Sequence, residues 1–433
     1  MAAMAASLLG GTAANAASMG AQLLIEADSG KVLHAENAGY PWHPASITKL
    51  MTAYVTLKAV REGRISFDTL LTVSANATAQ SPSKMGFKPG TKLTVDNALK
   101  MMMVKSANDM AVVLAEGVSG SIEAFAADMN RAARRLGMTQ TNYVNPNGLP
   151  DDAQVSSARD IAILARSFMH EMPEYDMYLH LPAIKFGKRT FRNFNGLMGR
   201  YPGADGIKTG FICASGYNLV GSATRDGRRL IAVVLGAPSG IARTTEAAEL
   251  LERGFTGPSL SWLTPSLGTV DALAAIDTAP VNLREEMCGK HRKRPATETS
   301  DGEEVTTTAA STEGMPELPF TLSLTNTKPT TPVRGADLLM PVAPPTQVYE
   351  VYLGPARKQP TTQIATAGPT SLVPAQAKPG QGGVQRASAG AIPWTNFSTS
   401  ALASSPPESL AVADPEEAGI PLPRPRPRSS SRH

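Results

Sequence analysis

A serine and a lysine three residues apart open a strongly patterned segment near the start of the chain. Ser46 and Lys49 form an S-x-x-K motif. Apolar residues follow at intervals of three and four, which predicts a helix with one buried face. On such a helix the lysine lies one turn beyond the serine, on the same side. A serine hydroxyl is a strong nucleophile only when a base takes its proton, so Lys49 is a candidate base for Ser46. The apolar positions are Ile47, Leu50, Met51, Tyr54 and Leu57.

This motif is weak by itself, because serine and lysine are common and residues 81–84 form a second S-x-x-K. Two other short motifs follow it. Ser106 and Asn108 form an S-x-N between two helical patterns. Two interpretations of it stay open: a cap for the second helix, or a proton relay at Ser106 with a substrate-binding amide at Asn108. A second S-x-N at residues 74–76 falls in a stretch that we interpret as extended and rank below Ser106.

The third motif is the single K-T-G of the chain, Lys208-Thr209-Gly210, in a predicted strand. Side chains alternate along a strand, so Lys208 and Gly210 are expected on one face and Thr209 on the other. Gly210 would leave room for a ligand backbone to approach.

The apolar periods predict a mixed α/β domain. We expect a hairpin at 21–35, a short strand at 70–73, helices at 110–116, 122–136, 156–170 and 243–255, and an antiparallel meander of 205–211, 215–224 and 230–235. Asp96 is predicted to cap a further helix that reaches Met103. Residues 185–204 are predicted to be irregular, and residues 346–354 hold at most one short strand.

A change in composition divides the chain at residue 257. Residues 18–257 carry the periodic apolar segments, whereas residues 258–433 are rich in Pro, Ser and Thr, which predicts a largely disordered tail. Residues 1–17 are small and apolar and contain Ala14-Asn15-Ala16, typical of the end of a secretory signal peptide. We therefore expect an exported protein.

Charge and cysteine content exclude several function classes. The net charge is +4, and no basic stripe is interleaved with aromatic residues, so nucleic acid is not an expected partner. No spacing of cysteines and histidines suggests a metal site, and none of the motifs calls for a cofactor. Cys213 and Cys288 lie on opposite sides of residue 257, and a disulfide between them stays open.

Together and in this order, S-x-x-K, S-x-N and K-T-G resemble the motifs of the penicillin-recognising serine acyltransferases, which include penicillin-binding proteins and class A β-lactamases. The sequence around them is similar to the low-molecular-mass D-alanyl-D-alanine carboxypeptidases. The similar stretches are residues 44–52, 147–149, 157–160, 205–210 and 215–220.

This resemblance implies a β-lactamase/transpeptidase-like α+β domain over about residues 18–257. An antiparallel sheet would be covered by helices, with a helical subdomain carrying Ser106 and a cleft between the two parts. The implied site residues are Ser46 as nucleophile, Lys49 as general base, Ser106 as proton relay, Asn108, Lys208, Thr209 and Gly210 in substrate binding, and Arg243 on the substrate's terminal carboxylate. A backbone N–H, that of Ser46 among others, would hold the oxyanion.

The implied reaction is removal of the terminal D-alanine from a peptidoglycan stem pentapeptide through an acyl-enzyme on Ser46, in the periplasm or envelope of a bacterium. β-Lactams would acylate the same serine. A class A β-lactamase also needs a deacylating glutamate, and residues 137–160 contain none. An endopeptidase of the same family, cutting D-Ala–diaminopimelate cross-links, stays open.

An alternative of another class is a non-catalytic wall-binding scaffold, and the tail could dock an envelope partner in either case. Relatives often end in an amphipathic membrane-binding helix. Residues 421–433 show no such pattern, so this route to the membrane is not predicted.

Overall fold

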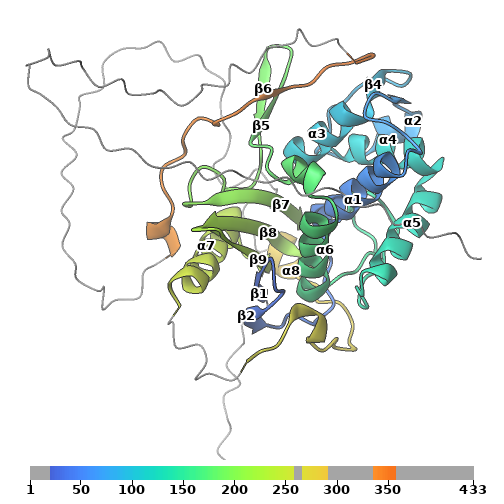
Figure 1. The fold of residues 1–433 in the computed structure, drawn as a ribbon. Helices are drawn as coiled ribbons and strands as arrows, with labels where there is room; N and C mark the ends of the chain where they lie inside the picture. The colour runs from blue at the N-terminus through green and yellow to red at the C-terminus, as the bar shows by residue number, and fades with distance from the viewer. Residues whose placement is uncertain (1–19, 258–265, 291–334, 357–433) are drawn as a thin grey trace, which may run out of the picture. The chain divides into compact units, whose positions relative to one another are not determined.

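The computed structural model describes residues 20–257, 266–290 and 335–356 (Figure 1). The predicted leader and most of the predicted tail lie outside these ranges. A five-stranded antiparallel sheet forms the centre, in the order β2-β1-β9-β8-β7. Its strands are β1 (Ala21–Glu26), β2 (Val32–Glu36), β7 (Ala204–Ile212), β8 (Gly216–Arg225) and β9 (Arg228–Ala237). The predicted hairpin and meander are both present, joined through the pairing of β1 with β9.

The central strands β8 and β9 are buried at consecutive positions, which requires cover on both faces of the sheet. Helices α6 (Ala158–Glu171) and α7 (Gly240–Thr256) both pack against β9 and supply that cover. Each helix is capped by a serine, Ser157 or Ser239. The serine side chain accepts a hydrogen bond from the backbone N–H three residues later.

The second part of the fold is helical and lies beside β7. It comprises α1 (Thr48–Arg61), α2 (Ala75–Ala79), α3 (Val95–Lys105), α4 (Asn108–Ser119), α5 (Ile122–Arg135) and the short hairpin of β3 (Leu70–Thr72) and β4 (Lys92–Thr94). Helix α4 is central, in contact with α1, α2, α3 and α5. Its apolar residues are buried from Met110 to Ala115. A predicted α+β fold with a helical subdomain is therefore confirmed.

Two local predictions are wrong. Helix α3 is capped by Thr94, not Asp96; the Thr94 hydroxyl accepts from the Asn97 N–H, and Asp96 instead pairs with Lys100 at 2.7 Å in the first turn. In the S-x-N at residues 74–76 only Ser74 is extended; it caps α2, and the two residues after it are already helical. In both cases the hydroxyl competes successfully for the free N–H groups at a helix start.

The prediction that residues 185–204 are irregular holds for 193–203 and is wrong for 185–192. β5 (Ala183–Phe186) and β6 (Arg189–Arg192) form a hairpin there, and Figure 1 shows it projecting beside α3. Its four-residue strands alternate too few apolar side chains to be recognised. The 3₁₀ helix η2 (Pro173–Leu179) precedes it.

Two segments beyond residue 257, in the predicted tail, lie on the domain. Residues 266–290 contain η4 (Val270–Ala272) and α8 (Arg284–Cys288). Backbone bonds attach them to the hairpin and to the loop after β7: Val270 N–H to Gly30 at 2.9 Å and Leu283 N–H to Ala214 at 2.9 Å. A disulfide joins Cys213 to Cys288.

Residues 335–356 form the second segment, with η5 (Gly335–Leu338) beside α7 and β10 (Tyr349–Glu350) paired in parallel with β5. Val351 is buried, and the next N–H, of Tyr352, donates to the buried Asn97 side chain at 3.1 Å. The short strand that the sequence allowed thus extends an existing hairpin instead of standing alone.

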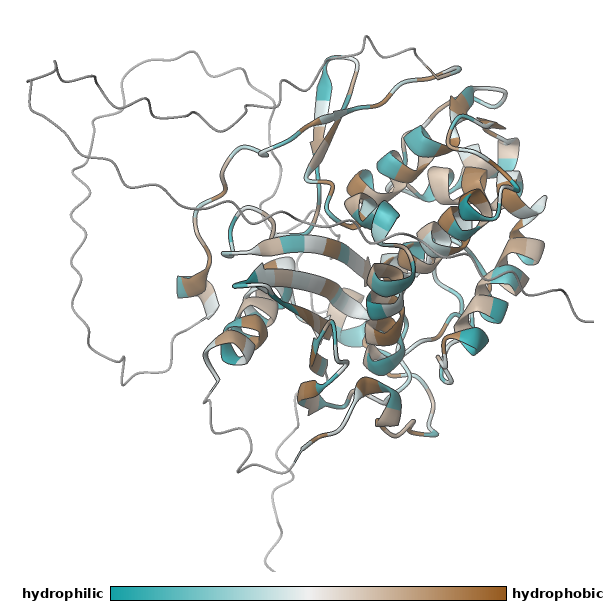
Figure 2. Ribbon diagram, in the orientation of Figure 1, coloured by the Kyte–Doolittle hydropathy of each residue, from teal (hydrophilic) through white to brown (hydrophobic). Residues whose placement is uncertain are grey.

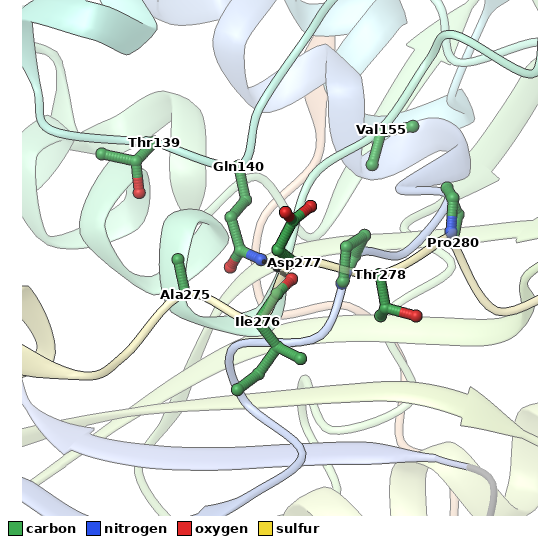
Figure 3. A pocket seen from close by; sticks show the side chains of 9 residues that line it. Thr139, Gln140, Val155, Ala275, Ile276, Asp277, Thr278 and Pro280 are labelled. Carbon is green, nitrogen blue, oxygen red and sulfur yellow. Dashed lines mark hydrogen bonds between the residues drawn. The ribbon is translucent and has the colours of Figure 1, made fainter.

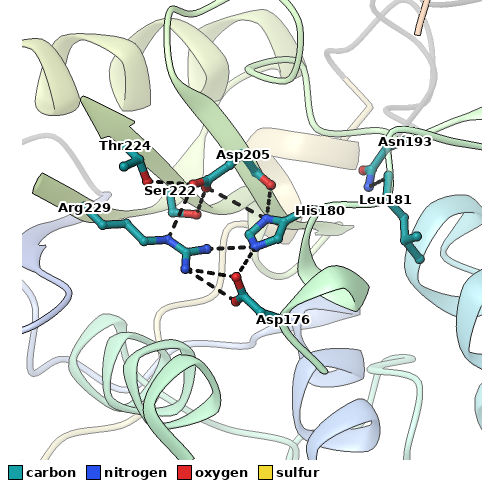
Figure 4. Close-up of polar contacts among 8 residues, drawn as sticks. All are labelled: Asp176, His180, Leu181, Asn193, Asp205, Ser222, Thr224 and Arg229. Atoms are coloured by element: carbon teal, nitrogen blue, oxygen red, sulfur yellow. Dashed lines mark hydrogen bonds and ion pairs between the residues drawn. The ribbon is translucent and has the colours of Figure 1, made fainter. Parts of the chain in front are cut away.

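A polar network fixes the start of β7 to its neighbours (Figure 4). Asp205 accepts from Thr224 at 2.9 Å and pairs with Arg229 at 3.4 Å. On η2, Asp176 contacts His180 at 2.7 Å and Arg229 at 3.2 Å. Burial raises the pKa of Asp176, but the hydrogen bonds and charges of His180 and Arg229 outweigh it and hold that pKa below its ordinary value.

Among the described residues, no single helix is both long enough and apolar enough to cross a membrane. Helices α4 and α5 meet both criteria only as a pair, and the chain bends by 84° between them.

Candidate active site

The S-x-x-K motif occupies a tight turn that leads into α1. Residues Ala45–Ile47 form the 3₁₀ turn η1, and the α-helix proper begins at Thr48. Lys49 Nζ donates to Ser46 Oγ at 2.8 Å, and the lysine side chain is fully buried. The predicted juxtaposition is therefore present, although the serine precedes the α-helix by two residues.

Two further acceptors fix the direction of the lysine. Its Nζ donates to Asn108 Oδ1 at 2.7 Å and to the carbonyl oxygen of Asn147 at 2.7 Å. With all three contacts made the lysine is an ammonium; in its neutral form it keeps two N–H groups, and its lone pair can take the hydroxyl proton along the contact with Ser46. Asn147 was not predicted as a site residue, because a backbone carbonyl leaves no side-chain signature in the sequence. The only signal was the similarity of residues 147–149 to the carboxypeptidase family.

The S-x-N and K-T-G motifs contact each other. Lys208 Nζ donates to Ser106 Oγ at 3.0 Å, and each side chain is only 1% exposed. Ser106 ends α3 in a left-handed conformation with φ of 56°. The N-cap of α4 is Ala107, without a side-chain capping bond, so the capping interpretation of this motif is wrong. Asn108 instead lies between Lys49 and the backbone of Ser81, to which it donates at 2.9 Å.

Strand β7 runs directly against the serine turn. A Cβ atom at Gly210 would lie 2.8 Å from the backbone nitrogen of Ser46 and 3.1 Å from that of Ile47, so only glycine allows this approach. Thr209 is fully buried, and its carbonyl accepts from Lys208 at 2.9 Å. The K-T-G strand thus borders the backbone N–H that was predicted to hold an oxyanion.

Arg243 lies in the first turn of α7, behind the end of β7. Its guanidinium is 3.5 Å from the Gly210 carbonyl oxygen and 3.4 Å from that of Asn218, and it lies over the Tyr217 ring at 5.5 Å. The side chain is 3% exposed. The structure places Arg243 at the K-T-G strand, and carboxylate binding stays a prediction.

The loop that carries Asn147 is held by residues without a motif. Gly148 has φ of +79°, and a Cβ there would lie 1.8 Å from the Ala45 carbonyl oxygen. Gln154, which is 2% exposed, donates to Thr48 Oγ1 at 2.9 Å and accepts from the Val144 N–H at 2.7 Å. Gln154 was not predicted as a site residue, because nothing in the sequence distinguishes it from a surface glutamine.

A separate cavity of about 380 Å³ lies between the domain and the 266–290 segment (Figure 3). None of the predicted site residues lines it; the lining residues are Pro41, Thr139, Gln140, Val155, Ala275, Ile276, Asp277, Thr278 and Pro280. Within the described ranges, no three His, Cys, Asp or Glu side chains are grouped so that they could hold a metal ion.

Comparisons with known proteins agree with this geometry. Residues 10–239, more than half of the chain, match the peptidase S11 family, described as D-alanyl-D-alanine carboxypeptidase. This chain belongs to the peptidase S11 family. It is 36% identical over 240 residues to the D-alanyl-D-alanine carboxypeptidase DacF of Bacillus subtilis, covering 54% of this chain and 61% of the relative. It is 38% identical over 242 residues to DacC of Escherichia coli, covering 54% and 60%.

Solved structures show the same fold for this S11 family member. Penicillin-binding protein 5 of Haemophilus influenzae matches with a TM-score of 0.52 and 36% identity, over 54% of this chain and 70% of that one. Penicillin-binding protein D2 of Listeria monocytogenes in the cefotaxime-bound form matches with a TM-score of 0.50 and 31% identity, over 55% and 96%. The chain spans about three fifths of the length of the first curated relatives that it matches.

Proposed function

We propose that this S11 family member is a serine D-alanyl-D-alanine carboxypeptidase that removes the terminal D-alanine of peptidoglycan stem pentapeptides. One observation carries the proposal: a fully buried Lys49 Nζ lies 2.8 Å from Ser46 Oγ. The activity in the relatives' names and the cefotaxime-bound form of one structural neighbour support it. An intact nucleophile and base argue against the scaffold interpretation.

In the first step, Ser46 Oγ attacks the carbonyl carbon of the penultimate D-alanine, and its proton passes to neutral Lys49 Nζ. Asn108 Oδ1 and the Asn147 carbonyl accept from the same nitrogen and keep it aimed at Ser46. The carbonyl oxygen becomes an oxyanion, which the Ser46 N–H beside Gly210 would hold.

In the second step, the C–N bond breaks and the leaving amine takes up a proton. Ser106 is the proposed relay, and its hydroxyl already accepts from Lys208. Positive charge from Lys208 and Arg243 would bind the terminal carboxylate, since charged donors form the strongest hydrogen bonds to carboxylates. Water then releases the acyl group from Ser46 by the reverse proton path. β-Lactams would form the same ester.

We also propose that the protein acts outside the cytoplasm, in the bacterial envelope. The disulfide between Cys213 and Cys288 supports this, because such bonds form and persist in oxidising compartments. In this proposal residues 1–17 are the remnant of a signal peptide, and a part of residues 258–433 docks a further envelope partner.

The test is D-alanine release from a soluble pentapeptide that ends in D-Ala-D-Ala. The wild type is compared with Ser46→Ala and with Ser81→Ala, which alters the exposed serine of the second S-x-x-K. We expect release from the wild type and from Ser81→Ala, and none from Ser46→Ala. No release with covalent penicillin still at Ser46 would move the substrate to cross-linked peptides. Neither release nor acylation would contradict the enzyme.

A further inference from the structure

Two cations share one aromatic ring beside the S-x-N motif. Lys105 Nζ and Arg189 Cζ each lie 5.1 Å from the centroid of Phe191. Lys105 ends α3, whereas Arg189 and Phe191 belong to β6 of the projecting hairpin. One ring is therefore contacted by a cation from the helix and by a cation from the hairpin.

The register of the hairpin explains why they meet. Phe186 pairs with Arg189 and Ile184 with Phe191, so these four side chains share one face. That face turns toward the helical part, because Phe186 packs on Phe87 at 5.3 Å. Figure 1 shows the hairpin beside α3, and Figure 2 shows its tip as hydrophilic.

No carboxylate among the described residues lies within ion-pair distance of Lys105 or Arg189. The nearest acid on α4, Asp109, is fully buried, and its oxygens accept from the backbone of Met85, Gly86 and Met110. Burial lowers the pKa of Lys105, the charge of Arg189 lowers it further, and Asp109 only partly opposes them. An anion bound here would relieve the repulsion between the two cations.

The cation pair is connected to the active site. Lys105 directly precedes Ser106, the residue that accepts from Lys208. Its Nζ is 3.4 Å from Ser83 Oγ, and the Ser83 carbonyl accepts from the Asn108 N–H at 2.7 Å. One loop thus contacts both Lys105 and the asparagine that directs Lys49.

We propose that Lys105 and Arg189 form a subsite for a carboxylate in the acyl-donor part of the substrate peptide. The proposal rests on the proposed function, because it assigns this surface to the peptide that Ser46 attacks. An ammonium and a planar guanidinium beside one ring match the oxygens of a carboxylate. The pair selects acidic stem peptides over neutral ones and takes no direct part in the chemistry.

Binding in a Ser46→Ala background tests the subsite without turnover. The probes are two peptides of equal length ending in X-D-Ala-D-Ala, with glutamate or glutamine at X, measured by calorimetry on the full chain. We expect the glutamate peptide to bind about five-fold more tightly, the effect of one favourable exposed ion pair. Lys105→Gln with Arg189→Gln should bring the ratio to about one. The matched control Lys188→Gln, an exposed cation of the same hairpin, should preserve it.

The single variant Arg189→Gln is included because Arg189 is exposed and its replacement should not disturb folding. It should lower the ratio of the two peptide affinities partway. Equal binding of both peptides, or an equal fall in Lys188→Gln, would overturn the subsite. D-Alanine release by the wild type from the same peptides is read separately. If no D-alanine is released but the glutamate peptide still binds more tightly, the proposed function is wrong and the subsite stands. If D-alanine is released but the two peptides bind equally, the subsite is wrong and the proposed function stands.

Discussion

The surroundings of Ser46 and the two C-terminal segments are held by different kinds of contact. Around Ser46, motif side chains bond to one another, as in Lys49 with Ser46 and Lys208 with Ser106. Residues 266–290 and 335–356 are attached mostly through backbone hydrogen bonds and one disulfide. Chemistry demands particular side chains at particular spacings, whereas backbone pairing accepts almost any sequence. The first region is therefore visible in the sequence and the second is not.

The largest expected effect separates the two S-x-x-K motifs. Lys49→Gln should lower kcat/KM for D-alanine release by about 10²–10⁴, the usual contribution of a general base. Lys84→Gln is the control, because Lys84 donates to a backbone carbonyl, that of Thr78, and not to the serine of its motif in the described structure. Steady-state kinetics on the pentapeptide measure both. Equal losses in the two variants would remove Lys49 from the proposed role.

Loss of the disulfide should affect stability and spare the chemistry. Cys213→Ser with Cys288→Ser opens a link across 75 residues and should lower the free energy of unfolding by about 2–4 kcal/mol. Urea unfolding measures the change, and wild type treated with dithiothreitol is the control. Retained stability in the double variant would show that the backbone contacts of 266–290 suffice.

Removing a buried side chain from the other segment should have a smaller effect. Val351 is 3% exposed. Val351→Ala should destabilise the protein by about 1.5 kcal/mol, because it removes two buried methyl groups. Val348→Ala, at a position that is 40% exposed, is the matched control and should change little. If thermal unfolding gave the same midpoint for both variants, residues 335–356 would contribute nothing to the domain.

The smallest effect is expected for Asp176, in the polar network at the start of β7, and it depends on pH. The folded pKa of Asp176 lies below its ordinary value of 3.8, so its contribution is present above pH 3.8 and is lost as the pH falls through the folded pKa. Asp176→Asn should therefore cost about 1 kcal/mol at pH 7, with a smaller difference from wild type below pH 3.8. Thermal unfolding at several pH values measures this. A difference that stayed constant with pH would contradict the ion-pair assignment.

The sequence predicted the meander, the α1 region and the residues that meet at Ser46, because each has a period or a motif. It placed the cap of α3 at Asp96, because Thr94 and Asp96 are both good capping residues two positions apart. It missed α2 after Ser74, because a five-residue helix is too short to show a helical period. The β5–β6 hairpin and the contacts of Gln154 depend on distant segments and left no local pattern. Composition did not show that residues 266–290 and 335–356 pack on the domain, because the chain after residue 257 is rich in Pro, Ser and Thr as a whole.

Mass mapping of the protein after reaction with benzylpenicillin tests the central claim most directly. The account predicts one covalent adduct on the peptide that contains Ser46. It also predicts no adduct there in Ser46→Ala and slow formation in Lys49→Gln. An adduct on Ser81 or Ser106, or none in the wild type, would contradict the assignment of Ser46 as the nucleophile.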